Sequence, residues 1–259
     1  MSASGHPQKA SAVNMQASTK HIMSTEKKSH AKPPTEGDRP LPSIAVIGDI
    51  VGSKQLPQAE RSHVQRQLEE LLNRINKRYA KAIGARFLVT LGDEFQGVLK
   101  QPDIIPDLIW DIETGLPKAE VRIGIGYGTL NPPLKRIALG MDGPAFHAAR
   151  AAIEEARKHR TRGGFFLGFG QAEDMLLNSL AALLHRQRAT LTENQLVALG
   201  LLRQGYSQSR IADKLGITKQ AVNSRAKSIG WEAYLQGEEA LRAILKRFDT
   251  SSAWLRRSR

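Results

Sequence analysis

The spacing of apolar residues changes several times along the chain, and each change predicts a new element of secondary structure. Short runs rich in β-branched residues predict strands at 43–47, 86–91, 95–99, 121–127 and 165–167. Apolar positions three or four residues apart predict helices at 58–83, 104–113, 145–159 and 173–185. Strand, helix, hairpin, helix, strand is the order of a split β-α-β-β-α-β sheet. The pattern therefore predicts an α+β fold of the ferredoxin-like or palm type.

Beyond residue 190 the pattern is helical throughout, and it predicts an all-α helix-turn-helix domain. A first apolar helix ends at Gly205, and Ser207 is placed to cap a second helix that runs to Leu215. The stretch from Gly216 to Thr218 predicts a tight turn, because glycine permits a positive backbone angle and threonine caps the next helix. Further helices are predicted over 219–229 and 238–248.

The helix at 219–229 carries the side chains that we expect to meet double-stranded DNA. Gln and Asn can make two hydrogen bonds to adenine, while Lys and Arg reach guanine or phosphate from the major groove. The predicted DNA-binding residues are Thr218, Lys219, Gln220, Asn223, Ser224, Arg225 and Lys227. The alternative is a segment of a helical bundle that has the same pattern without binding DNA.

The net charge of +13 is concentrated in the C-terminal part of the chain. Residues 43–185 carry 18 basic and 16 acidic side chains, whereas residues 186–259 carry 14 and 6. A basic surface confined to one region favours a polyanion partner, although a solvated basic surface gives the same count. The predicted parts are a disordered tail at 1–42, a palm-like domain at 43–170, a linker helix at 171–190 and a helix-turn-helix domain at 191–259.

Composition narrows the class of protein. The chain has 259 residues and no cysteine, which excludes disulfides and thiolate metal sites. No apolar run approaches the roughly 20 residues of a membrane-spanning helix, and no apolar stretch near the N-terminus is typical of a secretory signal. We therefore expect a cytoplasmic protein with no membrane partner.

Two acidic residues lie where the predicted sheet brings them together. Asp49 follows the first strand and Asp93 lies in the hairpin turn, and these strands are neighbours in a split β-α-β-β-α-β sheet. Two carboxylates with the backbone carbonyl of Ile50 suit Mg²⁺, or Mn²⁺, beside a bound phosphate. Glu94 is either a further metal ligand or a solvated charge. The alternative for both aspartates is that Gly-Asp pairs simply form turns.

Four sequence blocks in this region resemble the SatD family of bacterial proteins, over residues 43 to about 158. They are 48–53 (GDIVGS), 91–97 (LGDEFQG), 122–126 (RIGIG) and 142–150 (DGPAFHAAR). Members of that family are similar in carrying a helix-turn-helix behind this domain. The resemblance thus implies the same two-domain organisation.

The same blocks are more distantly similar to the class III nucleotidyl cyclases and related palm domains. That resemblance implies that Asp49 and Asp93 hold the metal and that Arg150 neutralises phosphate charge in catalysis. The chain departs from the cyclases at Val89 and Phe146, where those enzymes have a base-reading lysine and an asparagine. The resemblance therefore supports the fold and the metal site more than it supports cyclisation.

A nucleotide-binding set follows from these positions. It comprises Gly52, Ser53, Gly92, Asp142 and Arg150. Glycines let the backbone approach a ligand closely. Asp142 has a structural alternative, because it is also placed to cap the helix that starts near residue 145.

These features favour a DNA-binding regulator whose palm-like domain senses a nucleotide with Mg²⁺. The alternative is an enzyme, a divergent nucleotidyl cyclase or nucleotidyltransferase that the helix-turn-helix tethers to DNA. A third hypothesis is an interaction scaffold in which the aspartates only form turns. Regulators that read DNA half-sites are often dimers, which leaves a homodimer open.

Overall fold

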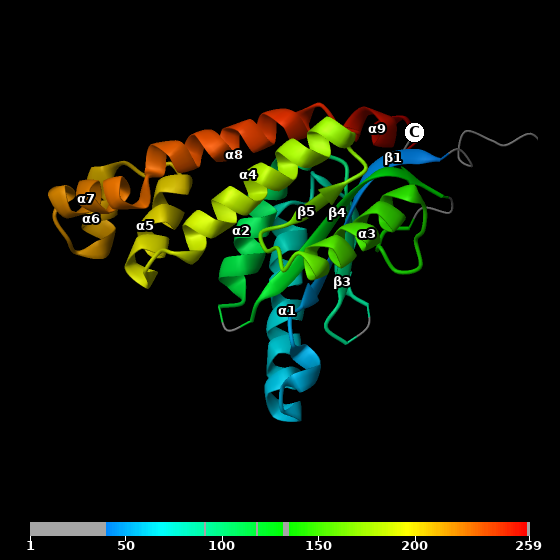
Figure 1. Ribbon diagram of the computed structural model, residues 1–259, viewed down its shortest axis with the longest axis horizontal. Coiled ribbons are helices and arrows are strands. Elements are labelled where there is room, and N and C mark those ends of the chain that lie inside the picture. The colour runs from blue at the N-terminus through cyan, green and yellow to red at the C-terminus, as the bar shows by residue number, and fades with distance from the viewer. Residues whose placement is uncertain (1–39, 91, 118, 132–134, 258–259) are drawn as a thin grey trace, which may run out of the picture. The chain divides into compact units, whose positions relative to one another are not determined.

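The computed structural model describes residues 40–90, 92–117, 119–131 and 135–257, and within them a five-stranded sheet lies at the centre (Figure 1). The strands are β1 (Leu41–Ile50), β2 (Ile83–Val89), β3 (Phe95–Leu99), β4 (Val121–Leu130) and β5 (Phe165–Leu167). Their order is β2-β3-β1-β4-β5. The central strand β1 runs antiparallel to β3 and β4, whereas β5 pairs with β4 in parallel.

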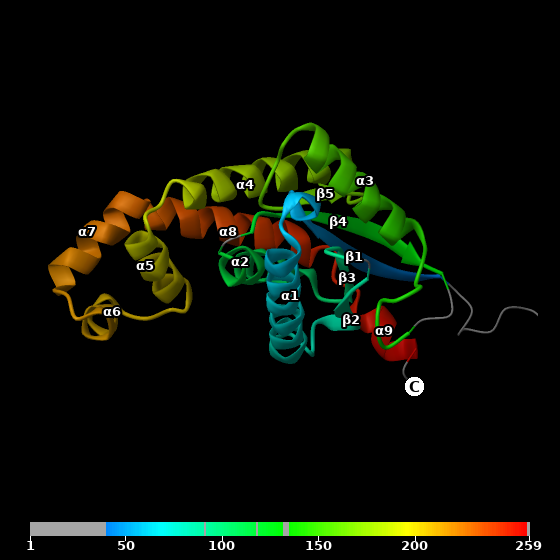
Figure 2. The same cartoon turned by 90° about the horizontal axis from the view of Figure 1, so that it is seen from below.

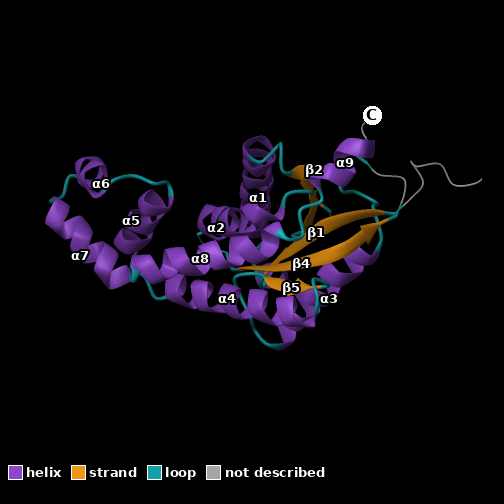
Figure 3. Cartoon of the chain, turned by 90° about the horizontal axis from the view of Figure 1, so that it is seen from above, coloured by secondary structure: helices purple, strands orange, loops and turns teal. Residues whose placement is uncertain are grey.

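Helices cover both faces of the sheet (Figure 3). Ile44 and Val46 of β1 face the core that α1 (Gln58–Arg78) and α2 (Ile105–Gly115) complete. The alternate residues Ala45 and Ile47 face a second core under α3 (Pro144–Lys158). Successive side chains of a strand point to opposite faces, so one apolar strand serves two cores. The element order and the strand order confirm the predicted α+β sheet.

Several element boundaries differ from the prediction. Residues 1–39 of the predicted tail lie outside the described residues. Strand β1 begins at Leu41, two residues before its predicted start at residue 43. The helix predicted over 58–83 was too long, because α1 ends at Arg78 and Ile83 already pairs with Leu99 in the sheet. Helical spacing alone does not reveal this change, since the pairing partner is distant in sequence.

A close approach of α3 to β4 fixes the helix on its face of the sheet. A Cβ atom on Gly124 would lie 2.3 Å from the carbonyl oxygen of Ala149, and one on Gly126 would lie 2.2 Å from its nitrogen. Real Cβ contacts do not reach these distances, so only glycine lets the helix backbone pack this tightly on the strand. The residues of α3 are thereby held at fixed positions above β4.

The C-terminal part is helical, and in Figure 2 the helices labelled α5, α6 and α7 are short separate segments. Its elements are α4 (Gln171–Ala189), α5 (Glu193–Arg203), α6 (Gln208–Leu215), α7 (Lys219–Ile229), α8 (Trp231–Lys246) and α9 (Ser251–Arg257). The predicted bounds of α7 are confirmed, as is the end of α6. By contrast, α4 extends beyond its predicted range at both ends, whereas α8 begins seven residues before its predicted start and ends two residues before its predicted end. The two helices pack against each other.

The described residues belong to one compact unit. Helix α4 spans the predicted linker and packs on β5 as well as on α8. The predicted division into a palm-like domain, a linker helix and a helix-turn-helix domain, with boundaries at residues 170 and 190, stays a prediction. In the described part of the chain, no helix has the length and apolar character needed to cross a membrane.

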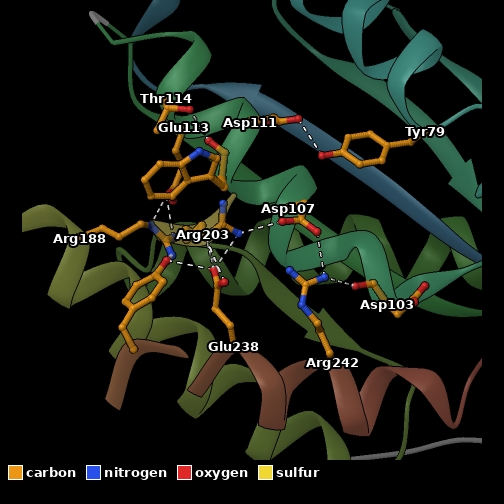
Figure 4. A network of polar contacts seen from close by, with 12 residues as sticks. Tyr79, Asp103, Asp107, Asp111, Glu113, Thr114, Arg188, Arg203, Glu238 and Arg242 are labelled. Carbon is orange, nitrogen blue, oxygen red and sulfur yellow. Dashed lines mark hydrogen bonds and ion pairs between the residues drawn. The ribbon is translucent and has the colours of Figure 1, made fainter. Parts of the chain in front are cut away.

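Buried ion pairs join the helices that follow the sheet to α2, as Figure 4 shows. Arg203 of α5 lies 3.0 Å from Asp107 of α2 and 2.9 Å from Glu238 of α8. Its guanidinium also lies 4.5 Å from the ring centroid of Trp110. Arg242 of α8 pairs with the other oxygen of Asp107 at 2.9 Å. One arginine thus connects three helices.

A second part of this network centres on Glu113 of α2. Arg188 of α4 lies 2.6 Å from Glu113 and donates a 2.9 Å hydrogen bond to the Tyr234 hydroxyl, which in turn donates to Glu238. Burial would raise the pKa of Glu113, but His185 and Arg188 together hold it below its ordinary value. We call Asp107, Glu113, Arg188, Arg203, Tyr234, Glu238 and Arg242 the interface network. The two partners of Glu113 thus favour its charged form despite its burial.

The interface network predicts a large stability difference between two arginine substitutions. The Arg203 side chain is 6% exposed, so Arg203→Ala leaves Glu238 as a buried carboxylate without its partner and should lower the free energy of unfolding by about 3–5 kcal/mol. Arg78 pairs with Asp111 but is 58% exposed, and Arg78→Ala should cost less than about 1 kcal/mol. Urea unfolding followed by circular dichroism measures both values. Equal losses of unfolding free energy in the two variants would show that the interface network does not stabilise the packing of α5 and α8 against α2.

Candidate functional site

The carboxylate of Asp49 lies at the end of β1 and faces α3. In the sheet register Asp49 pairs with Arg122 of β4, and its Oδ1 lies 3.0 Å from the Nε of that arginine. Its Oδ2 lies 3.3 Å from a guanidinium nitrogen of Arg157, which α3 supplies. Both oxygens of the predicted metal ligand therefore face arginines.

The surroundings of Asp49 are mostly buried, and this affects its charge. Burial raises the pKa of Asp49 above its ordinary value, against the opposing pull of Arg122 and Arg157, and the charge of Asp93 adds to the increase. Oδ1 of Asp49 and Nε of Arg122 are close but are not aligned for a hydrogen bond. The ion pair is thus electrostatic, without the directional bond that usually completes a buried pair.

The two acidic residues of the hairpin turn point to different partners. Ser53 donates a hydrogen bond to Asp93, on the side of α1. Glu94 accepts from Arg150 of α3, with a distance of 3.0 Å between Oε1 and Nη2. This hydrogen bond raises the pKa of Arg150 above its ordinary value. Glu94 is therefore the partner of an arginine, whereas the sequence left open whether it is a metal ligand or a solvated charge.

These residues do not fit a metal ion in this arrangement. The charge of Asp49 is balanced by two arginines. The cavity beside Ser53, Gly92 and Asp93 has a volume of only about 10 Å³, which is about the space that one water molecule needs. Within the described ranges no group of three or more His, Cys, Asp or Glu residues is placed to hold a metal. A cation at the Ile50 carbonyl would have to displace these contacts, so binding of Mg²⁺ or Mn²⁺ stays a prediction from the sequence.

The other predicted nucleotide-binding residues are divided between two places. Gly52 lies next to Ser53 at the end of β1 and adopts a φ of 71°, a left-handed conformation that favours glycine. Asp142 lies at the opposite end of the sheet, where its carbonyl accepts from Asn131 just beyond β4. The interpretation of Asp142 as a helix cap was wrong, because Gly143 occupies the cap position without a side-chain bond. Asp142 instead pairs with His147 at 3.0 Å.

Two arginines of this site had no role in the sequence analysis. Arg122 follows directly from the pairing of β1 with β4, which brings it opposite Asp49. Arg157 lies seven residues after Arg150, so both lie on the same face of α3. That spacing was a signal present in the sequence. We call Asp49, Glu94, Arg122, Arg150 and Arg157 the carboxylate–arginine cluster.

A second candidate site is the exposed side of α7. Gly216 has a φ of 63° and ends α6, and Thr218 caps α7 by accepting from the nitrogen of Ala221 at 3.1 Å. Val222, Ala226 and Ile229 are buried beneath the helix. Ser228 makes side-chain hydrogen bonds, but the other polar side chains of α7 make no hydrogen bond or ion pair within the described part of the chain. We call these others the α7 face; they are Lys219, Gln220, Asn223, Ser224, Arg225 and Lys227.

A family model provides an independent comparison. The model of the SatD family matches residues 43–245, which is more than three quarters of the chain. The chain belongs to the SatD family. The match includes the sheet, the carboxylate–arginine cluster, the α7 face and nearly all of α8. One family domain thus spans both candidate sites of this SatD protein.

Two solved structures show a low similarity, and each is described as a bacterial light-regulated adenylyl cyclase. The first has 18% sequence identity and a TM-score of 0.39, and covers 49% of this SatD chain and 76% of that chain. The second has 21% identity and a TM-score of 0.38, and covers 49% of this chain and 43% of that chain. TM-scores this low do not indicate a shared activity. No curated protein matches the chain.

Proposed function

We propose that this SatD protein is a DNA-binding regulator and that α7 is its recognition helix. The observation that carries the proposal is the α7 face, a row of polar and basic side chains without partners within the described residues. Such side chains retain their full capacity to bond bases and phosphates. With its side chains an α-helix is about 10–12 Å across, which fits a major groove about 12 Å wide. At 1.5 Å per residue, the 11 residues of α7 extend about 16 Å.

The neighbouring helix adds positive charge beside the α7 face. Residues 208–230 carry five basic side chains and one acidic side chain. Arg210 and Lys214 of α6 both lie over the ring of Tyr206, at 5.2 and 4.9 Å from its centroid. In a helix-turn-helix the first helix crosses the phosphate backbone, and we propose that these two residues contact the phosphates there.

Removal of one basic residue from the α7 face tests DNA binding. Lys219→Ala should weaken binding to a genomic fragment pool and lower the slope of log K against log salt by about 0.9, as expected for one lost phosphate contact. Lys246 is exposed on α8, outside the α7 face, so Lys246→Ala should bind like the wild type. Fluorescence anisotropy at several salt concentrations measures both. Equal binding by all three proteins would contradict the assignment of the recognition helix.

For the sheet domain, we propose that the carboxylate–arginine cluster binds the phosphates of a nucleotide. Arg150 and Arg157 are half-exposed at one end of the sheet, and each is held by carboxylates. Guanidinium groups bind phosphate in the same two-bond geometry that they use for carboxylate. A phosphate group would replace Glu94 as the partner of Arg150. This arrangement supports binding better than metal-dependent catalysis, because Asp49 is already neutralised.

Thermal unfolding with each nucleoside triphosphate tests this second proposal. A nucleotide present at 100 times its Kd should stabilise the wild type by about 2.7 kcal/mol without added metal, and Arg150→Ala should lose that effect. Arg74→Ala, on the exposed side of α1, is the matched control. Chromatography of the same samples detects products. Stabilisation that requires Mg²⁺ and disappears in Asp49→Asn, or any cyclic product, would favour the enzyme instead.

A further inference from the structure

A cleft of about 680 Å³ lies where α2, the start of β4, α4 and α5 meet. Trp110 contributes one apolar wall, and Val121, the first residue of β4, also lines the cleft. The facing wall consists of Leu196, Val197 and Leu201 of α5. Clefts of about 300–1,000 Å³ with mainly apolar walls and a few polar groups are typical of small-molecule sites. This cleft has that size and composition.

The apolar wall on α5 has no occupant within the described part of the chain. Val197 is 47% exposed, and Leu196 and Leu201 are partly exposed beside it. A molecule that covered these side chains would remove their apolar surface from water, which is favourable in proportion to the area covered. The wall therefore favours a ligand with an apolar body.

The charged groups around the cleft are mostly paired with one another. Arg188 lies 2.6 Å from Glu113, and Arg162 lies 2.9 Å from Glu120. Both described lining arginines are thus occupied, whereas Glu193 has no partner among the described residues. A ligand with phosphate or carboxylate groups would find no unpaired cation among these residues and would meet a negative charge at Glu193. Among the described residues, the charges around the cleft therefore offer an anion no free cation.

One polar atom at the cleft has a defined hydrogen-bonding role. The Nδ1 of His185 lies 2.9 Å from an oxygen of Glu113, which is a carboxylate because Arg188 also pairs with it. Nδ1 therefore donates its proton to Glu113, and Nε2 makes no hydrogen bond within the described chain. A polar group of a ligand, such as a hydroxyl, can bond to Nε2, because a hydroxyl both donates and accepts.

We propose that this cleft binds an uncharged, mainly apolar small molecule that makes one hydrogen bond to His185 through a hydroxyl or amino group. The site is separate from the carboxylate–arginine cluster and does not depend on nucleotide or DNA binding. Its ligand contacts α2 of the sheet domain and α5. Helix α5 is joined to α7 by a 3.0 Å hydrogen bond from Gln195 to Ser228.

A fluorescent probe of this chemical class tests the site in the full chain. N-Phenyl-1-naphthylamine is uncharged, has one N–H donor and fluoresces in apolar surroundings. We expect saturable binding of one molecule per chain. Val197→Glu, which places a charge on the apolar wall, and Val197→Phe, which narrows the cleft beside that wall, should each raise its Kd at least about tenfold. Leu183→Glu is the control, because Leu183 is 68% exposed on α4 and does not line this cleft.

The related anion 1-anilinonaphthalene-8-sulfonate tests the chemical class. It should bind more weakly than the uncharged probe, because the cleft offers no unpaired described arginine. Circular dichroism confirms that each variant is folded before titration. Three results would overturn the proposal: no saturable binding, wild-type affinity in both Val197 variants, or tighter binding of the sulfonate.

Discussion

The contact of Arg203 with Asp107, Glu238 and Trp110 holds the helices after the sheet against the sheet domain. A guanidinium this deeply buried needs both carboxylates, because an unpaired charge in such surroundings costs several kcal/mol. The pairs are directional, and they come from α2, α5 and α8. They therefore specify one position of α5 relative to α2, in a way that apolar packing alone does not. The cleft beside Trp110 exists because these helices are held apart at fixed positions.

The ends of α6 and α7 could be predicted because their signals are local. Gly216 and Thr218 determine the turn within a few residues, whatever the rest of the chain does. The end of α1 could not be predicted in this way, since it depends on the pairing of Ile83 with Leu99 across the sheet. Likewise, the extra turns of α4 and α8 depend on their packing against each other.

The candidate site on the sheet was predicted only in part, for a related reason. Strand order was sufficient to bring Asp49 and the hairpin turn to one end of the sheet. The partners of these carboxylates depend on the register of β4 and on the face that α3 presents, which its close packing on Gly124 and Gly126 determines. No role was therefore assigned from the sequence to Arg122 and Arg157, whose guanidinium groups contact Asp49, one of the two predicted metal ligands.

We propose that the α7 face of this SatD protein binds DNA. Hydrogen–deuterium exchange of the full chain, with and without a short DNA duplex at low salt, is the sharpest test of that proposal. Backbone amides at residues 216–229 should exchange more slowly with the duplex present, with little change in the strands of the sheet. Unchanged exchange at 216–229, or protection confined to the sheet, would contradict it.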